Sequence, residues 1–274
     1  MIADHRHSLR RPRGVFDFAA LAERPVPAIF AHRGASRLHR ENTLRAFTAA
    51  IALGADGIEV DVRRTRDGVL VVHHNARPLG SSRRIASLDY DALLELARRR
   101  AYHVPTLEET LDLCAGRAAL DLELKESGYE AEVVRLVRRR YDLRHVAFTS
   151  FRGPVVAALR KAAPRAALGL LVGPAAPGTL RLALRRSALA RKIDRVGADF
   201  IAPHRRLVTR AFSARMEELG VPVAVWTVNT LPAAQRLTRR GVAILITDLP
   251  GTIGPAVRSL GEKGARGEPP REDL

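Results

Sequence analysis

The sequence has 274 residues and a mass of 30.0 kDa, enough for one large domain or two small ones with a sizeable buried core. Hydrophobic residues make up 46% and charged residues 27%, which excludes a wholly disordered chain. The single cysteine, Cys114, excludes an internal disulfide framework and a cysteine-cluster site for zinc or iron–sulfur.

The net charge of +17 comes from 46 basic and 29 acidic residues, and nearly all of the basic residues are arginines. They are scattered in doublets and triplets, such as 98–100 and 138–140, mostly where helices are expected to face solvent. Aromatic residues make up only 5%, too few for a base-stacking platform. The pattern favours a solvated surface and predicts no specific nucleic-acid partner, while weak association with an anionic membrane surface stays open.

The sequence lacks a run of about 18 apolar residues, so no transmembrane helix is expected. The basic N-terminus is not followed by the apolar stretch and cleavage site of an export signal. The predicted location is therefore the cytoplasm.

In chain order, residues 1–26 are predicted to form a flexible arm, residues 27–260 a single domain and residues 261–274 a disordered tail. Within the domain, short apolar or β-branched runs alternate with segments of helical periodicity. The runs cover residues 28–34, 57–63, 119–125, 146–151, 167–172, 198–203, 223–228 and 243–248. Such near-continuous apolar strands are typical of a parallel sheet that is buried on both faces.

Eight strands alternating with helices predict an α/β protein with a single (β/α)8 TIM barrel. An open, doubly wound sheet is the alternative. That fold favours a G-x-G-x-x-G loop after the first strand, and the sequence HRGASRLHREN does not match it.

Residues 69–75 form a ninth run, separated from the second by only a few residues around the Asp-Gly dipeptide at 67–68. A parallel crossover needs a dozen or more residues, so this run is predicted to return as a β-hairpin extension of the second strand. With Asp-Gly as a two-residue loop, Asp61 would lie opposite His74, and Glu59 would share their face. The hairpin therefore predicts that these three side chains converge.

Charged side chains interrupt the apolar strands near their C-terminal ends, where the active sites of barrels lie. Glu59, Asp61 and Glu123 would repel one another unless their pKa values rise or a hard dication binds, and oxygen ligands suit one Ca²⁺ or Mg²⁺ ion. Arg33 and Lys125 are cations suited to holding an anion. A simpler interpretation of Glu123 and Lys125 alone is a buried salt bridge.

Two histidines complete this constellation. His32 ends the first strand and His74 lies on the hairpin, and imidazoles exchange protons near neutral pH. A metal, two cations and two imidazoles around one cavity favour phosphodiester cleavage, in which one histidine deprotonates the nucleophile and the other protonates the leaving alkoxide. Trp226 and Phe151, at the ends of two further strands, are predicted to form a substrate wall.

The phrases AHRGAS, RENTLRAF, GADGIEVDVRRTRDGVLVVHHN, VPTLEETLDL, LDLELK, TSF, WTVNT and ITDLP occur in this order. Together they resemble the glycerophosphodiester phosphodiesterase family over about residues 29–250. The resemblance implies a TIM barrel that uses a divalent metal to hydrolyse glycerophosphodiesters to an alcohol and sn-glycerol 3-phosphate, through a cyclic phosphate intermediate.

The resemblance also implies roles for individual residues. His32 and His74 would be the general acid and base, and Arg33 and Lys125 would contact phosphate. The metal ligands would be Glu59, Asp61 and Glu123, and Glu41 would lie near the first loop as part of the substrate wall.

The sequence departs from the family pattern after the second histidine. His74 is followed by Asn75 where the family usually has aspartate, and the stretch 78–104 is short, which suggests an open mouth. Two alternatives therefore stay open: a lysophospholipase D-type phosphodiesterase that acts on lysophospholipids, and a catalytically idle barrel that binds polyanions. The alcohol group, the choice between Ca²⁺ and Mg²⁺, the oligomeric state and the order of the histidines are left open.

Overall fold

The computed structural model describes residues 24–173 and 186–265. Most of the predicted arm and tail lies outside these residues. Residues next to the predicted domain boundaries belong to the folded structure, because Val26 is buried in the core and Arg24 is ion-paired with Asp56. The last helix, α11 (Pro250–Ala265), extends past the predicted boundary at 260.

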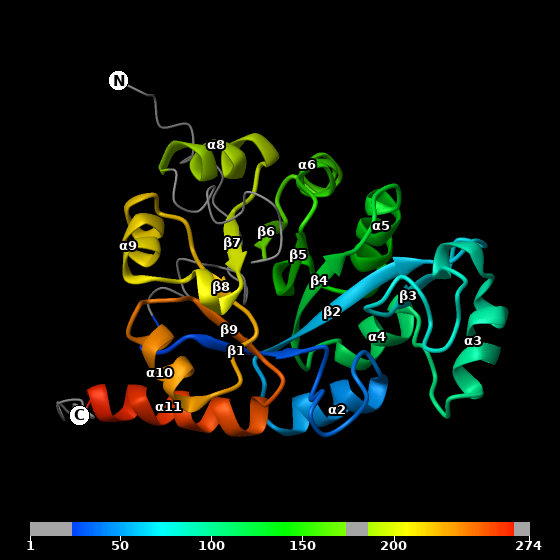
Figure 1. Ribbon diagram of the computed structural model, residues 1–274, viewed down its shortest axis with the longest axis horizontal. Coiled ribbons are helices and arrows are strands. Elements are labelled where there is room, and N and C mark those ends of the chain that lie inside the picture. The colour runs from blue at the N-terminus through cyan, green and yellow to red at the C-terminus, as the bar shows by residue number, and fades with distance from the viewer. Residues whose placement is uncertain (1–23, 174–185, 266–274) are drawn as a thin grey trace.

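Eight parallel strands form a nearly closed barrel (Figure 1), which confirms the predicted fold. The strands are β1 (Ala28–His32), β2 (Gly57–Arg64), β4 (Ala119–Leu124), β5 (Val146–Ser150), β6 (Ala167–Val172), β7 (Phe200–Pro203), β8 (Ala224–Val225) and β9 (Ile244–Thr247). The first and last strands pair with each other, and two isolated bridges, Ile201 with Val223 and His204 with Trp226, join β7 to β8.

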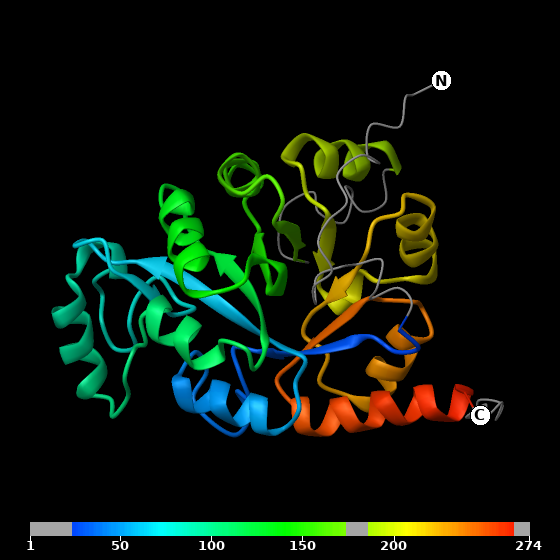
Figure 2. The same ribbon diagram turned by 180° about the vertical axis from the view of Figure 1, so that it is seen from behind.

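The helices cover the outside of the barrel, as both faces of the molecule show (Figures 1 and 2). They are α2 (Leu44–Ala52), α4 (Leu107–Cys114), α5 (Glu130–Arg140), α6 (Gly153–Ala162), α8 (Arg186–Val196), α9 (Arg210–Glu218), α10 (Leu231–Thr238) and α11, with short turns η2 (Leu143–His145) and η3 (Arg205–Leu207). Thr106 caps α4 through a reciprocal capping box with Glu109, which fixes where that helix begins.

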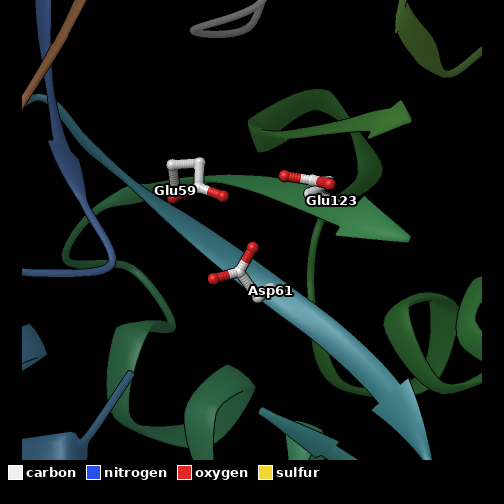
Figure 3. A group of neighbouring side chains, drawn as sticks. All are labelled: Glu59, Asp61 and Glu123. Atoms are coloured by element: carbon white, nitrogen blue, oxygen red, sulfur yellow. The ribbon is translucent and has the colours of Figure 1, made fainter. Parts of the chain in front are cut away.

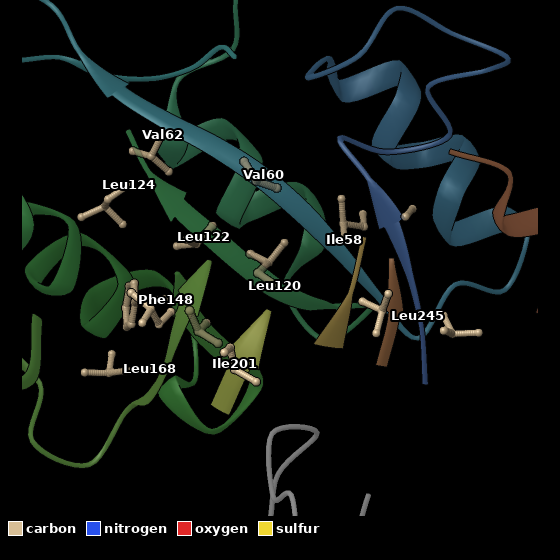
Figure 4. Packing of buried hydrophobic residues seen from close by; sticks show 14 of the residues in the cluster. Ile58, Val60, Val62, Leu120, Leu122, Leu124, Phe148, Leu168, Ile201 and Leu245 are labelled. Atoms are coloured by element: carbon tan, nitrogen blue, oxygen red, sulfur yellow. The ribbon is translucent and has the colours of Figure 1, made fainter. Parts of the chain in front are cut away.

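Alternate residues of the strands build two separate cores. Ile58, Val60 and Val62 of β2 point outward and pack with residues of the other strands against the helices (Figure 4). The intervening positions point into the barrel, where Phe30 fills the space that Gly57 leaves open; a Cβ on Gly57 would lie 2.3 Å from the Phe30 ring. Since side chains alternate along a strand, the outward valines force Glu59 and Asp61 into the barrel.

The predicted hairpin is present, but the predicted register is wrong by one residue. Strand β3 (Leu70–Val72) pairs antiparallel with β2, and Val62 lies opposite Val72. The loop has three residues, because Thr65 pairs with Val69 and Gly68 has a positive φ of 89°. Asp61 therefore lies opposite His73, whose N–H donates to the Asp61 carbonyl, and not opposite His74.

The hairpin leads into a small satellite layer that stands out from the barrel wall (Figure 1). Turn η1 (Ile85–Ser87) and helix α3 (Tyr90–Arg98) pack on the hairpin through Val71, Leu88 and Leu93. This layer occupies the stretch that the sequence indicated as short, and it holds the end of β3 beside the barrel mouth.

Candidate active site

Three carboxylates from two neighbouring strands meet inside the barrel (Figure 3). Glu59 and Asp61 come from β2 and Glu123 from β4, and the register pairs Asp61 with Glu123. All three side chains are buried, and one oxygen from each lies within 4.8 Å of the others. The predicted convergence of these groups is therefore present in the structure.

Two cations balance the carboxylates. Lys125 Nζ lies 2.6 Å from Asp61 Oδ1 and 2.7 Å from Glu123 Oε1. Arg33 Nε lies 3.1 Å from Asp61 Oδ2, and the Arg33 backbone N–H donates to Glu59 Oε2 at 3.1 Å. Because three negative charges face two positive ones, the group keeps an excess of negative charge when all are ionised.

The pKa values of the carboxylates differ according to their neighbours. Burial, and then the charge of Asp61, raise the pKa of Glu59 well above its usual range. Burial also raises the pKa of Glu123, although Lys125 opposes the effect. Burial acts in the same direction on Asp61, but Lys125 and Arg33 outweigh it and lower the pKa of that carboxyl. Asp61 is therefore the most strongly ionised of the three.

Asn42 fixes the orientation of Asp61 from the loop after β1. Its side-chain amide donates to Asp61 Oδ2 at 2.7 Å, and its Oδ1 accepts from the Asp61 N–H at 3.3 Å. Asn42 and Arg33 both have a left-handed backbone, with φ of 55° and 58°. Such backbone conformations are costly for non-glycine residues and concentrate at functional sites. The same loop places Glu41, which accepts from Arg33 Nη1 at 2.9 Å.

His32 is held by Asp248, which follows the last strand. The His32 Nδ1–H donates to Asp248 Oδ1 at 2.6 Å, and His32 Nε2 lies 3.9 Å from Glu59 Oε2. Ser36 and Asn229 also donate to Asp248, at 3.1 and 2.6 Å. Burial would raise the pKa of Asp248, but these hydrogen bonds and the charge of His32 lower it. The ionised carboxylate thus directs His32 Nε2 toward the acidic group.

His74 lies at the mouth of the barrel, two residues after the end of β3. It lines a cavity of about 250 Å³ together with Glu123, Lys125 and Phe151. Its Nδ1 lies 3.1 Å from Asn75 Oδ1, so Asn75 is its hydrogen-bond partner. Burial lowers the pKa of His74 to about 4 against the opposing charge of Asp61, which leaves the imidazole neutral at pH 7.

Arg63 holds the backbone of this segment. It is buried on the inward face of β2, two residues beyond Asp61, and its guanidinium donates to the carbonyls of His73 and His74 at 3.1 and 3.0 Å. It is also ion-paired with Glu126, in the loop after β4. Arg63 therefore connects the loop that follows Lys125 to the segment that carries His74.

The predicted substrate wall is aromatic. Phe151 and Trp226 meet edge to face with ring centroids 5.5 Å apart, and His204 also meets Trp226 edge to face, at 5.1 Å. The Trp226 indole N–H donates to the Ala202 carbonyl at 2.8 Å, which fixes the ring. Glu41 lies apart from these rings, beside Arg33.

Several residues of the site were not among the predicted ones. In the sequence, Asp248 and Asn229 are polar residues that follow predicted strands. A closed barrel makes β1 and β9 neighbours, and this closure was the signal that could have placed both residues beside His32. Arg63 continues the period-two pattern of Glu59 and Asp61. Asp121, buried and bonded to Thr149 at 2.8 Å, lies one step deeper on β4.

The donor set fits a hard dication. The three buried carboxylates can each offer an oxygen ligand, and none offers nitrogen or sulfur. Oxygen ligands suit Ca²⁺ or Mg²⁺ better than a metal that prefers nitrogen or sulfur. The residual negative charge of the group favours a cation as well.

Residues 32–252 match the profile of the glycerophosphoryl diester phosphodiesterase family. The chain belongs to this family. A glycerophosphodiester phosphodiesterase of Caldanaerobacter subterraneus subsp. tengcongensis is 28% identical over 249 residues, which cover 85% of this chain and 98% of the relative. The family and the enzyme class that the motifs predicted are thereby confirmed.

Solved structures show the same fold. A Silicibacter pomeroyi protein, provisionally assigned as a glycerophosphoryl diester phosphodiesterase, superposes with a TM-score of 0.75 at 28% identity, covering 86% of this chain and 94% of the other. An Oleispira antarctica phosphodiesterase, solved in complex with the product sn-glycerol-3-phosphate, gives a TM-score of 0.74 at 22% identity, with 85% and 97% covered. Among the described residues, no helix is long and apolar enough to span a bilayer.

Proposed function

We propose that this family member hydrolyses glycerophosphodiesters to an alcohol and sn-glycerol 3-phosphate with a divalent cation and two histidines as acid and base. The observation that carries the proposal is that both histidines reach the same buried acidic group: His32 Nε2 lies 3.9 Å from Glu59 Oε2, and His74 lines a cavity with Glu123. The named relatives and the product found in the Oleispira antarctica structure support the substrate class.

Arg33 and Lys125 are the phosphate-binding groups in this proposal. Both lie against Asp61, so their positive charges are held at fixed positions before a substrate arrives. Such preorganised charge stabilises the negative charge that develops on phosphoryl oxygens without reorganisation during the reaction.

The two histidines divide the proton transfers. His74 is neutral at pH 7 and can accept the proton of the attacking hydroxyl. His32, bonded through Nδ1 to Asp248, can deliver a proton from Nε2 to the leaving alkoxide, and Asp248 offsets the positive charge of the protonated ring. The substrate hydroxyl that loses its proton would attack phosphorus and expel the alcohol, which leaves a cyclic phosphate. Water would then open this ring to give sn-glycerol 3-phosphate, with the two histidines in reversed roles.

Glu59, Asp61 and Glu123 would hold the divalent cation. When bound, the cation would act as a Lewis acid that polarises the phosphoryl group. Burial raises the pKa of Glu59 and of Glu123, and a bound cation would favour the ionised form of both carboxyls.

The direct experiment incubates the purified protein with glycerophosphocholine and couples the reaction to detection of glycerol 3-phosphate. We expect turnover that stops with a chelator, returns with Ca²⁺ or Mg²⁺, and is lost in His32→Ala and His74→Ala. A turnover rate that is the same with and without the chelator would refute the metal role. An undiminished rate in His32→Ala would refute the acid–base assignment. The half-buried His39, on the loop that follows β1, provides the control variant His39→Ala.

A further inference from the structure

The exposed large hydrophobic side chains of the described residues all lie at the end of the barrel that carries the site. They are Leu38 (64% exposed), Leu79 (55%), Phe151 (43%) and Leu231 (42%). Each follows the C-terminal end of a strand: β1, β3, β5 and β8 respectively. A single exposed leucine needs no explanation, but four at one end of the molecule form a pattern.

Each of these side chains is close to a residue of the active site. Leu38 lies two residues after Ser36, and Leu231 two residues after Asn229, and both of those polar residues donate to Asp248. Leu38 and Leu231 therefore stand on the His32 side of the mouth.

The other two stand on the His74 side. Leu79 lines a small cavity with His74 and Glu41, and Phe151 lines the adjoining cavity with His74 and Lys125. The four apolar side chains consequently lie on four different loops at the mouth of the barrel.

Exposed arginines accompany them, three on the same loops and one in the turn η3 after β7. Arg37, Arg84, Arg152 and Arg206 are exposed, and none has a carboxylate partner among the described residues. The acidic side chains near the mouth already have partners: Glu41 pairs with Arg33, Glu126 with Arg63 and Asp248 with His32. The rim is therefore positively charged as well as apolar.

We propose that this rim binds the surface of an anionic lipid aggregate, so that the mouth takes its phosphodiester from amphiphiles at an interface. We call Leu38, Leu79, Phe151, Leu231 and the four arginines the mouth rim. Apolar side chains that enter the acyl boundary, combined with arginines that meet anionic headgroups, are the two contributions that hold peripheral proteins on membranes. The cleavage of a lipid phosphodiester at the mouth rests on the proposed function, whereas the binding of the rim to a lipid surface does not.

The same chemistry argues against a nucleic acid as the occupant. Projecting leucines add nothing to phosphate recognition, and a single-strand binder needs several aromatic stacking positions along its groove. Trp226, the largest aromatic side chain near the mouth, is fixed by Ala202 and packed against Phe151 and His204.

The test is co-sedimentation of the full chain with vesicles of phosphatidylcholine, with and without phosphatidylglycerol, at physiological salt. We expect binding to the phosphatidylglycerol vesicles only. The double variant Leu38→Ser/Leu231→Ser should bind about tenfold more weakly, and Arg37→Gln/Arg206→Gln should also lose binding. Arg117→Gln/Arg139→Gln, whose side chains line a cavity at the opposite end of the barrel, is the matched control and should bind as the wild type does.

Hydrolysis separates this inference from the proposed function. In Leu38→Ser/Leu231→Ser, turnover of water-soluble glycerophosphocholine should stay unchanged, while turnover of a lysophospholipid presented in anionic vesicles should fall with binding. The rim inference would be overturned if the wild type does not bind vesicles, or if the control Arg117→Gln/Arg139→Gln loses as much vesicle binding as the rim variants do. Either result would hold even if glycerophosphocholine is hydrolysed. Binding that depends on the arginines but not on the leucines, and that a single-stranded polynucleotide abolishes, would assign the rim to polyanions and would also overturn the rim inference.

Vesicle binding without any hydrolysis would support the rim inference and refute the proposed function.

Discussion

His32 and Asp248 form a 2.6 Å hydrogen bond across the seam where the first and last strands of the barrel pair. Their sequence positions are 216 residues apart, so the contact exists only in the closed barrel. Asn229, in the loop after β8, holds the second oxygen of the same carboxylate. The barrel's closure therefore fixes the imidazole that we assign as a catalytic acid.

Asp248→Asn should lower kcat by about 10²–10⁴-fold, because general acid–base catalysis contributes about that much and the amide cannot offset a protonated imidazole. KM for glycerophosphocholine should change little, since the Asp248 oxygens bond to His32, Ser36 and Asn229 and to neither phosphate-binding residue. Steady-state kinetics of Asp248→Asn and of the control Ser36→Ala, which removes only a weaker donor to the same carboxylate, provide the measurement. A kcat for Asp248→Asn within threefold of that of Ser36→Ala would contradict the assignment.

Arg63→Met should reduce kcat by about tenfold or more, because a misplaced catalytic group loses rate steeply with small displacements. The guanidinium touches the His73 and His74 carbonyls and Glu126 but no proposed reacting group. Its expected signature is therefore a loss of kcat with a nearly constant KM.

The neighbouring Arg64→Met is the matched control for Arg63→Met. Arg64 points outward, and its guanidinium pairs with Glu132 and donates to the Gly128 carbonyl, away from the carbonyls of His73 and His74. A circular-dichroism melt should show both variants folded at the assay temperature. Equal kinetics in the two variants would remove the positioning role of Arg63.

Much of the fold followed from the sequence because its signals are local. Eight apolar runs, each followed by a helical pattern, indicated the strands within a few residues of their observed bounds. The period of two in Glu59 and Asp61, and in Glu123 and Lys125, placed each pair on one face of its strand without any long-range information.

The hairpin shows where local signals failed. Asp-Gly favoured a two-residue loop, but the Thr65 hydroxyl accepts from the Val69 N–H at 2.9 Å and donates to Asp67, which closes a three-residue loop. A shift of one residue should have turned His74 away from Asp61. His74 reaches the mouth nevertheless, because β3 ends at Val72 and Arg63 bonds the carbonyls that follow.

The pH dependence of stability should reflect Asp121. Burial, against the opposing hydrogen bond from Thr149, raises its pKa to about 7. A carboxyl whose folded-state pKa exceeds its unfolded value stabilises the protein fully below the unfolded pKa, near 4, and loses that contribution as the pH rises through 7. The stabilisation lost has an upper bound of about 4 kcal/mol at roughly 1.4 kcal/mol per pKa unit.

Asp121→Asn keeps the acceptor for Thr149 and cannot ionise. We expect this variant to gain stability relative to the wild type on going from pH 5 to pH 8, measured as the difference in Tm between the two proteins at each pH. The exposed Asp91→Asn should show no such trend. A Tm difference between Asp121→Asn and the wild type that is the same at both pH values would show that Asp121 does not titrate in this range.

Binding of a divalent cation should raise Tm independently of catalysis. A ligand that binds only the folded state at 100 times its Kd adds about 2.7 kcal/mol to the free energy of unfolding. Glu123→Gln should abolish most of the increase produced by Ca²⁺ or Mg²⁺, because it removes one of three carboxylates that converge within 4.8 Å. Glu41→Gln, near the mouth but outside that group, is the control and should keep it. An equal rise in Tm in both variants would place the cation elsewhere, and no rise in the wild type would refute the metal site.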